Sequence, residues 1–103
     1  MQLVKVKCCD KINQDQMHYI QNIVDKIEGL APSDSSVLLE VFEKDGKLCG
    51  LIKINALMMR LKVLISKQIC CYKLLDVLDD QCLSQIKKWK QKRKFMEYDY
   101  EGT

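Results

Sequence analysis

The stretch from Tyr72 to Lys94 constrains the fold of this chain most, because it combines an apolar stripe with charges that are sorted along its length. The apolar residues recur at steps of three and four, at Leu75, Leu78, Cys82, Ile86 and Trp89. This spacing predicts an amphipathic helix whose apolar face is wide enough to lie on a sheet. Trp89 follows the stripe, so we expect it to pack in the core rather than to stack on a nucleic-acid base.

The two halves of this helix differ in charge. The first turns carry Asp76, Asp79 and Asp80, whereas the last turns carry six basic residues: Lys87, Lys88, Lys90, Lys92, Arg93 and Lys94. Both ends suit the helix macrodipole, but six cations exceed what the dipole needs. Residues 1–86 hold equal numbers of basic and acidic residues, so the cluster creates the net charge of +3. The cluster itself supplies +6, of which Glu97, Asp99 and Glu101 return −3. It indicates either contacts with RNA phosphates or a solvated helix end.

Length and composition predict a single domain with one two-layer core, since the chain has 103 residues, of which 48% are hydrophobic. The first residues do not read as a signal peptide, and no apolar run reaches membrane-span length, so we expect a cytoplasmic protein. Six cysteines without a C-x-x-C spacing suggest reduced thiols, mostly in the core.

Alternating apolar residues predict four strands, over residues 2–9, 37–43, 48–56 and 60–66. The second and third should form a hairpin, because Asp45-Gly46 suits a type I′ turn. The inward-facing residues are expected to be Val4, Val6, Cys8, Val37, Leu39, Val41, Ile52, Ile54, Leu61, Val63 and Ile65.

A first helix is predicted between the first two strands. Asn13 should cap it, with Gln16 at capping-box spacing, and Gly29 should mark its end. Its buried stripe would consist of Met17, Ile20, Val24 and Ile27.

The element order is therefore β-α-β-β-β-α. It predicts an α+β two-layer sandwich, with a mostly antiparallel four-stranded sheet and both helices on one face. We expect the domain to span residues 1–96, followed by a flexible acidic tail over residues 97–103. The other sheet face would carry Lys5, Lys7, Lys53, Arg60 and Lys62, diluted by Leu38, Glu40 and Phe42. That face is either part of a basic surface or ordinary solvated surface.

Three segments together carry a recognisable pattern over roughly residues 2–95. In the last helix, the residues that belong to this pattern are Tyr72, Leu75–Asp76, Asp80, Gln85–Ile86, Lys87–Lys88 and Lys90. The first helix and the hairpin contribute Tyr19–Ile20, Val24, Lys26–Ile27, Glu28, Leu38–Glu43 and Leu51–Ile54. In these places the chain resembles the ribosome hibernation promoting factor family, also called ribosome-associated inhibitor A or sigma-54 modulation protein. It is similar to a divergent short form of that family.

The resemblance implies a translation regulator that binds ribosomal RNA of the small subunit and occludes the channel for messenger and transfer RNA. Carried over by position, the implied RNA contacts are Lys26, Lys87, Lys88, Lys90 and Lys92, and Arg93 and Lys94 extend the same rod. We expect a monomer in solution, without a small-molecule substrate or a membrane partner. The chain departs from the family in having few basic residues on the first helix, where Ile23 and Gly29 stand instead. On the last helix, Gln81 and Ser84 occupy two positions that are usually basic.

Two other functions remain open from the sequence. The chain could be a protein-interaction domain that kept the fold and lost the ribosome, which the sparse charge on the first helix favours. It could also be a double-stranded RNA-binding module, whose α-β-β-β-α order lacks the leading strand. No pattern indicates catalysis or a cofactor: His18 has no evident partner, and the cysteine pairs do not have zinc-ligand spacing.

Overall fold

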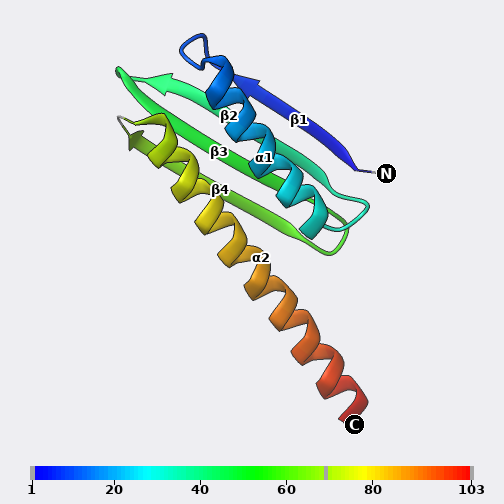
Figure 1. Ribbon diagram of the computed structural model, residues 1–103. Helices are drawn as coiled ribbons and strands as arrows, with labels where there is room; N and C mark the ends of the chain where they lie inside the picture. Colours follow the sequence, from blue (N-terminus) through cyan, green and yellow to red (C-terminus); the bar gives the residue numbers. More distant parts are fainter. Residues whose placement is uncertain (1, 69, 103) are drawn as a thin grey trace.

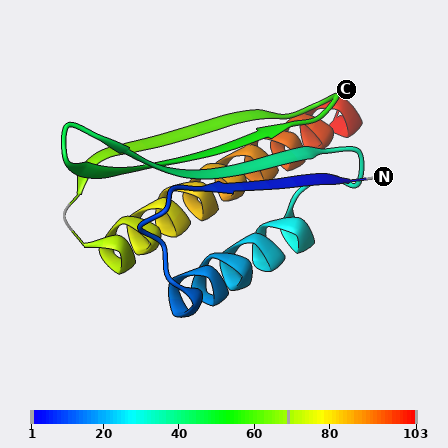
Figure 2. The ribbon, with the colours of Figure 1, turned by 90° about the horizontal axis from the view of Figure 1, so that it is seen from above.

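The computed structural model describes residues 2–68 and 70–102, with side chains for residues 2–66 and 70–91. Four strands form one sheet, and both helices cover the same face of it, as Figure 2 shows. The elements in chain order are β1 (Leu3–Cys8), α1 (Gln14–Leu30), β2 (Ser36–Lys44), β3 (Lys47–Asn55), β4 (Arg60–Gln68) and α2 (Cys71–Gly102) (Figure 1). The predicted α+β sandwich is therefore confirmed.

The strands lie in the order β1-β2-β3-β4, with β1 parallel to β2 and the other two pairs antiparallel. The β1-to-β2 connection runs through α1, because a parallel pair needs a crossover rather than a tight turn. The β2–β3 hairpin turns at Asp45 and Gly46, whose φ angles are 56° and 76°. Two consecutive positive φ angles are what a type I′ turn requires, so the predicted turn is confirmed.

The core lies between the sheet and the two helices. Val37, Leu39 and Val41 are buried on β2, opposite Ile54 and Ile52 of β3 in the strand register. The stripe of α2 is buried as predicted: Leu75, Leu78, Cys82 and Ile86 are each at most 1% exposed. β1 contributes least, because it is an edge strand and its residues are at best half-buried. Alternation thus predicted correctly the buried side of β2, whereas on β1 the inward prediction was wrong for Val4, which is 39% exposed on the edge strand.

Helix α1 begins as predicted and ends differently. The Asn13 side chain accepts from the Gln16 N–H, and the Gln16 side chain accepts from the Asn13 N–H, so the capping box is confirmed. The predicted end at Gly29 was wrong, since the helix runs to Leu30 and its cap residue, Ala31, is extended. Ala31 precedes the proline of the chain, and a residue before proline is disfavoured in the helical region.

The buried stripe of α1 also differs by one residue from the prediction. Ile20, Val24 and Ile27 are buried, but Met17 remains 37% exposed in the first turn, and Ile23 is buried at 5% exposure instead. The stripe therefore begins one turn later than predicted.

Helix α2 is longer than the predicted helix. Its backbone continues beyond Lys94 to Gly102 and extends past the edge of the sheet (Figure 1). The molecule is accordingly elongated, with principal extents of 54 × 26 × 19 Å. The division into a domain over residues 1–96 and a flexible tail over residues 97–103 stays a prediction.

Candidate nucleic-acid interface

Trp89 marks the point at which α2 leaves the sheet. Its side chain is half-buried and packs against the core, as expected from its place in the apolar stripe. Its indole Nε1 donates to the carbonyl oxygen of Met58 in the β3–β4 turn, at 2.9 Å. This hydrogen bond fixes α2 to the end of the sheet, and the predicted basic cluster begins on either side of it.

Lys87, Lys88 and Lys90 are all exposed, and none forms an ion pair with another residue whose side chain the structure describes. Successive helical residues are rotated by about 100°, so these three ammonium groups spread over the sides of α2 that face away from the sheet. The other predicted members of the cluster, Lys92, Arg93 and Lys94, continue along the helix backbone, and their side chains lie outside the described residues. The described part of the cluster is thus a group of unpaired cations around a helix end.

The structure does not bring Lys26 together with this cluster. Its Nζ lies 2.7 Å from Oδ2 of Asp79, so the charge that was predicted to contact RNA is paired within the molecule. Asp79 precedes Lys87 by eight residues, which places the pair about 12 Å back along the axis of α2. The side chain of Lys26 is 48% exposed and that of Asp79 is 17% exposed, so the pair sits at the surface between the helices.

A second polar contact joins the helices near the start of α2. The hydroxyl of Tyr19 donates to a carboxylate oxygen of Asp76. This hydrogen bond, together with burial and the nearby carboxylates, raises the pKa of Tyr19. The ring of Tyr19 meets the ring of Tyr72 edge to face, with centroids 5.3 Å apart. Tyr72 therefore packs on α1.

The seam between the two helices, formed by Tyr19, Lys26, Asp76, Asp79 and Asp80, is consequently acidic rather than basic. Asp76 contacts Tyr19 and Asp79 contacts Lys26 across it, and the carboxylate of Asp80 is close enough to add to the raised pKa of Tyr19. Basic character returns only at the far end of α2. Sequence reasoning identified each of these charges, but the cancellation depends on the packing of residues more than fifty positions apart.

The cysteines of the described residues are free thiols that differ in burial. Burial raises the pKa of Cys82 to about 11, which keeps this thiol protonated and unreactive at neutral pH. Cys70 is exposed, whereas Cys71 is buried and its pKa is raised by the burial. Among the side chains that the structure describes, no three His, Cys, Asp or Glu residues are grouped as a metal site requires.

Comparison with known proteins finds a match in structure only. Neither the models of protein families nor the curated proteins give a match to the sequence. The fold is similar to that of the N-terminal domain of Protein Y from Thermus thermophilus, with a TM-score of 0.66 and 14% sequence identity. The match covers 86% of this chain and 99% of that domain. The similarity concerns the fold, and the α+β fold predicted from the sequence is confirmed.

Within the described residues, neither helix has the length and apolar character needed to cross a bilayer.

Proposed function

We propose that this protein binds the small ribosomal subunit through the basic end of α2 and regulates translation by occluding the channel for messenger and transfer RNA. The observation that carries the proposal is the group of exposed, unpaired ammonium groups on Lys87, Lys88 and Lys90. They occur on a fold that is shared with a ribosome hibernation promoting factor. The proposed contacts continue along α2 to Lys92, Arg93 and Lys94.

In the proposed mechanism the folded body acts as a wedge and the helix end as its anchor. Lysine ammonium groups neutralise RNA phosphates and release counterions, which supplies affinity without reading sequence. The anchor projects from the body, so it can enter a groove of folded RNA while the sheet and α1 fill the space beside it (Figure 1). Lys26 takes a secondary part, because it must first exchange Asp79 for a phosphate.

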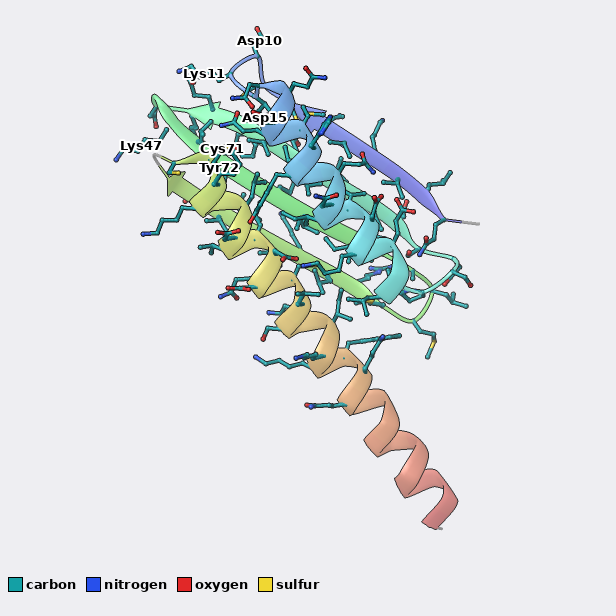
Figure 3. The ribbon with its side chains drawn as sticks, viewed as in Figure 1. Asp10, Lys11, Asp15, Lys47, Cys71 and Tyr72 are labelled. Carbon is teal, nitrogen blue, oxygen red and sulfur yellow. The ribbon has the colours of Figure 1, made fainter. Side chains whose placement is uncertain are left out.

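Cosedimentation with purified small subunits tests the proposal. The wild-type protein should pellet with the subunit at low salt and be released as salt rises, because each phosphate contact makes the affinity more salt-dependent. The triple variant Lys87→Glu/Lys88→Glu/Lys90→Glu should fail to pellet. A matched control is Lys44→Glu/Lys47→Glu/Lys73→Glu, which makes the same change of charge with exposed lysines at the other end of the molecule. Figure 3 shows Lys47 at that end, beside the start of α2.

One observation favours a second candidate, a protein-interaction domain that has the same fold but does not bind the ribosome. The acidic seam and the Lys26–Asp79 pair remove positive charge from the helical face. If the wild-type protein does not pellet with the subunit at low salt, or if the control variant loses binding as much as the helix variant, this second candidate replaces the first.

A further inference from the structure

The sheet face opposite the helices is uncovered and carries an uneven distribution of charge. Lys5 and Lys7 of β1, Lys53 of β3 and Lys62 of β4 are exposed, together with Arg60 at the start of β4. The acidic residue among them on the described strands is Glu40, and none of the five cations forms an ion pair with a described side chain. The face therefore has an excess of positive charge, which is offset only in part by Glu40, opposite Lys7 in the strand register, and by Asp34, which borders the same cavity as Arg60.

The strand register arranges three of these lysines in one row. Lys5 is opposite Leu38, Leu38 is opposite Lys53, and Lys53 is opposite Lys62. Neighbouring strands are about 4.8 Å apart, so the row spans about 14 Å. Like charges directly opposite each other destabilise a sheet, and Lys53 and Lys62 are such a pair. An anion between them would remove this repulsion.

The basic row lies along a connected depression. A cavity of 550 Å³ is bordered by Lys5, Lys7 and Lys53, and a cavity of 740 Å³ by Lys53, Arg60 and Lys62. The two share Lys53 and Asn55. A third cavity of 170 Å³ is bordered by Arg60 of β4 and by Lys88 of α2. We name this surface, from Lys5 to Lys88 through Lys53, Lys62 and Arg60, the sheet track.

We propose that the sheet track binds the sugar-phosphate backbone of a single RNA strand, as a second contact surface in addition to the helix end. The cations form a narrow row rather than a broad patch, so they match the line of phosphates along one RNA strand. Its cations are mostly lysines, which act as point charges on phosphates without selecting bases. It joins the helix end at Lys88, so one RNA strand can run from α2 around β4 onto the sheet. The continuation of the RNA strand from the sheet past Lys88 onto α2 rests on the proposed function, whereas the binding of RNA to the sheet does not.

The test uses the full chain and a fluorescent oligouridylate of 20 nucleotides, with fluorescence anisotropy measured at several salt concentrations. The sheet variant is Lys5→Glu/Lys62→Glu. We expect its affinity at low salt to fall about tenfold or more, and the slope of log K against log salt to decrease by about 1.4, since each single-strand phosphate contact contributes about 0.7. The matched control is Lys47→Glu/Lys73→Glu, which has the same net charge and lies outside the cavities. Its slope should stay close to that of the wild type.

Misfolding is separated from lost binding by the single variant Lys62→Glu. It replaces a repulsive cross-strand pair by an attractive one with Lys53, so it should melt at or above the wild-type temperature while binding the oligouridylate more weakly. A labelled oligoglutamate with the same number of charges distinguishes RNA from an acidic protein segment. If the affinity of the sheet variant falls as much for the oligoglutamate as for the oligouridylate, the assignment to RNA is overturned.

The sheet track and the proposed function are overturned by different results. If the sheet variant binds the oligouridylate as the control does, or if the wild type does not bind it, the sheet track is overturned whatever the ribosome experiment shows. If the sheet variant binds the oligouridylate more weakly while the wild type does not pellet with the small subunit, the sheet track stands and the proposed function is overturned.

Discussion

At the scale of single residues, the ion pair between Lys26 and Asp79 decides how much of the helical face is available to an anion. Lys26 is about half exposed, and a surface pair of this kind stabilises the fold by about 0.2–1 kcal/mol at most. The second carboxylate oxygen of Asp79, Oδ1, is buried and has no hydrogen-bond partner among the described residues. The pair therefore contributes little stability, but it withdraws one cation from the surface.

Asp79→Asn should release Lys26 and strengthen RNA binding. The affinity for the oligouridylate should rise about fivefold, which corresponds to about 1 kcal/mol for one added phosphate contact. Asp80→Asn is the matched control, since it removes the same charge from a neighbouring exposed position that Lys26 does not contact. Anisotropy titrations of both variants give the comparison. Equal gains for the two variants would mean that only the net charge matters and that Lys26 does not reach the RNA.

The residue scale also shows where sequence reasoning was limited. The capping box of Asn13 and the turn at Asp45 and Gly46 were predictable, because both depend on residues within three positions of each other. The partner of Lys26 is 53 positions away, and the partner of Trp89 is 31 positions away. Such contacts depend on how the helices lie against each other and on the sheet, which local spacing does not determine.

At the scale of elements, the close approach of α2 to β3 depends on one glycine. A Cβ atom at Gly50 would lie 2.3 Å from Cδ1 of Leu78 and 3.3 Å from Cδ1 of Leu74. Both leucines are fully buried in the core, so neither side chain can move aside without disturbing its neighbours. The pairing of β3 with β4 is also irregular here, between Leu48 and Gly50. The absence of a side chain at this position therefore lets the helix lie close to the sheet.

Gly50→Ala should destabilise the protein by about 1–3 kcal/mol, because it overpacks the contact between α2 and β3. Gly29→Ala is the matched control: the added Cβ in α1 would meet nothing within 4 Å, and alanine favours a helix over glycine by about 0.5–1 kcal/mol. Urea denaturation followed by circular dichroism measures both. We expect opposite signs for the two variants, and a Gly50→Ala protein as stable as the wild type would show that Leu78 has room to repack.

The elements themselves were predictable to different degrees. The strands were placed well because each has one apolar face, as in β2, where alternate residues are buried. Helix ends were placed less well: the chain leaves α1 at Ala31 because of the proline that follows, and α2 continues to Gly102. The close approach at Gly50 left no signal in the sequence, because a glycine within a strand pattern has several possible causes.

At the scale of the whole molecule, charge also varies along the length of the chain. The described core ends near Trp89, and the described residues before Lys87 hold nearly balanced charge. The helix beyond the core is where the remaining predicted RNA contacts lie, followed by the acidic residues Glu97, Asp99 and Glu101. Fold and proposed binding are thus separable along the chain, which allows them to be tested by shortening it.

Two truncations should leave the fold intact and change RNA binding in opposite directions. A chain ending at residue 96 keeps every basic residue and loses three acidic ones, so its net charge rises from +3 to +6 and it should bind the oligouridylate more tightly. A chain ending at residue 91 also loses Lys92, Arg93 and Lys94, which restores the net charge of +3. Its salt slope should be about 2 smaller than that of the longer truncation, because three single-strand phosphate contacts are gone.

Because full-length protein and the chain ending at residue 91 have equal net charge, their comparison separates local contacts from overall charge. Urea denaturation should place both truncations within about 0.5 kcal/mol of the full-length protein, since the described core does not extend past Trp89. If the chain ending at residue 91 binds RNA with the same salt slope as the chain ending at residue 96, the basic residues beyond Lys90 make no phosphate contacts. A large loss of stability would instead place residues 92–96 within the folded unit.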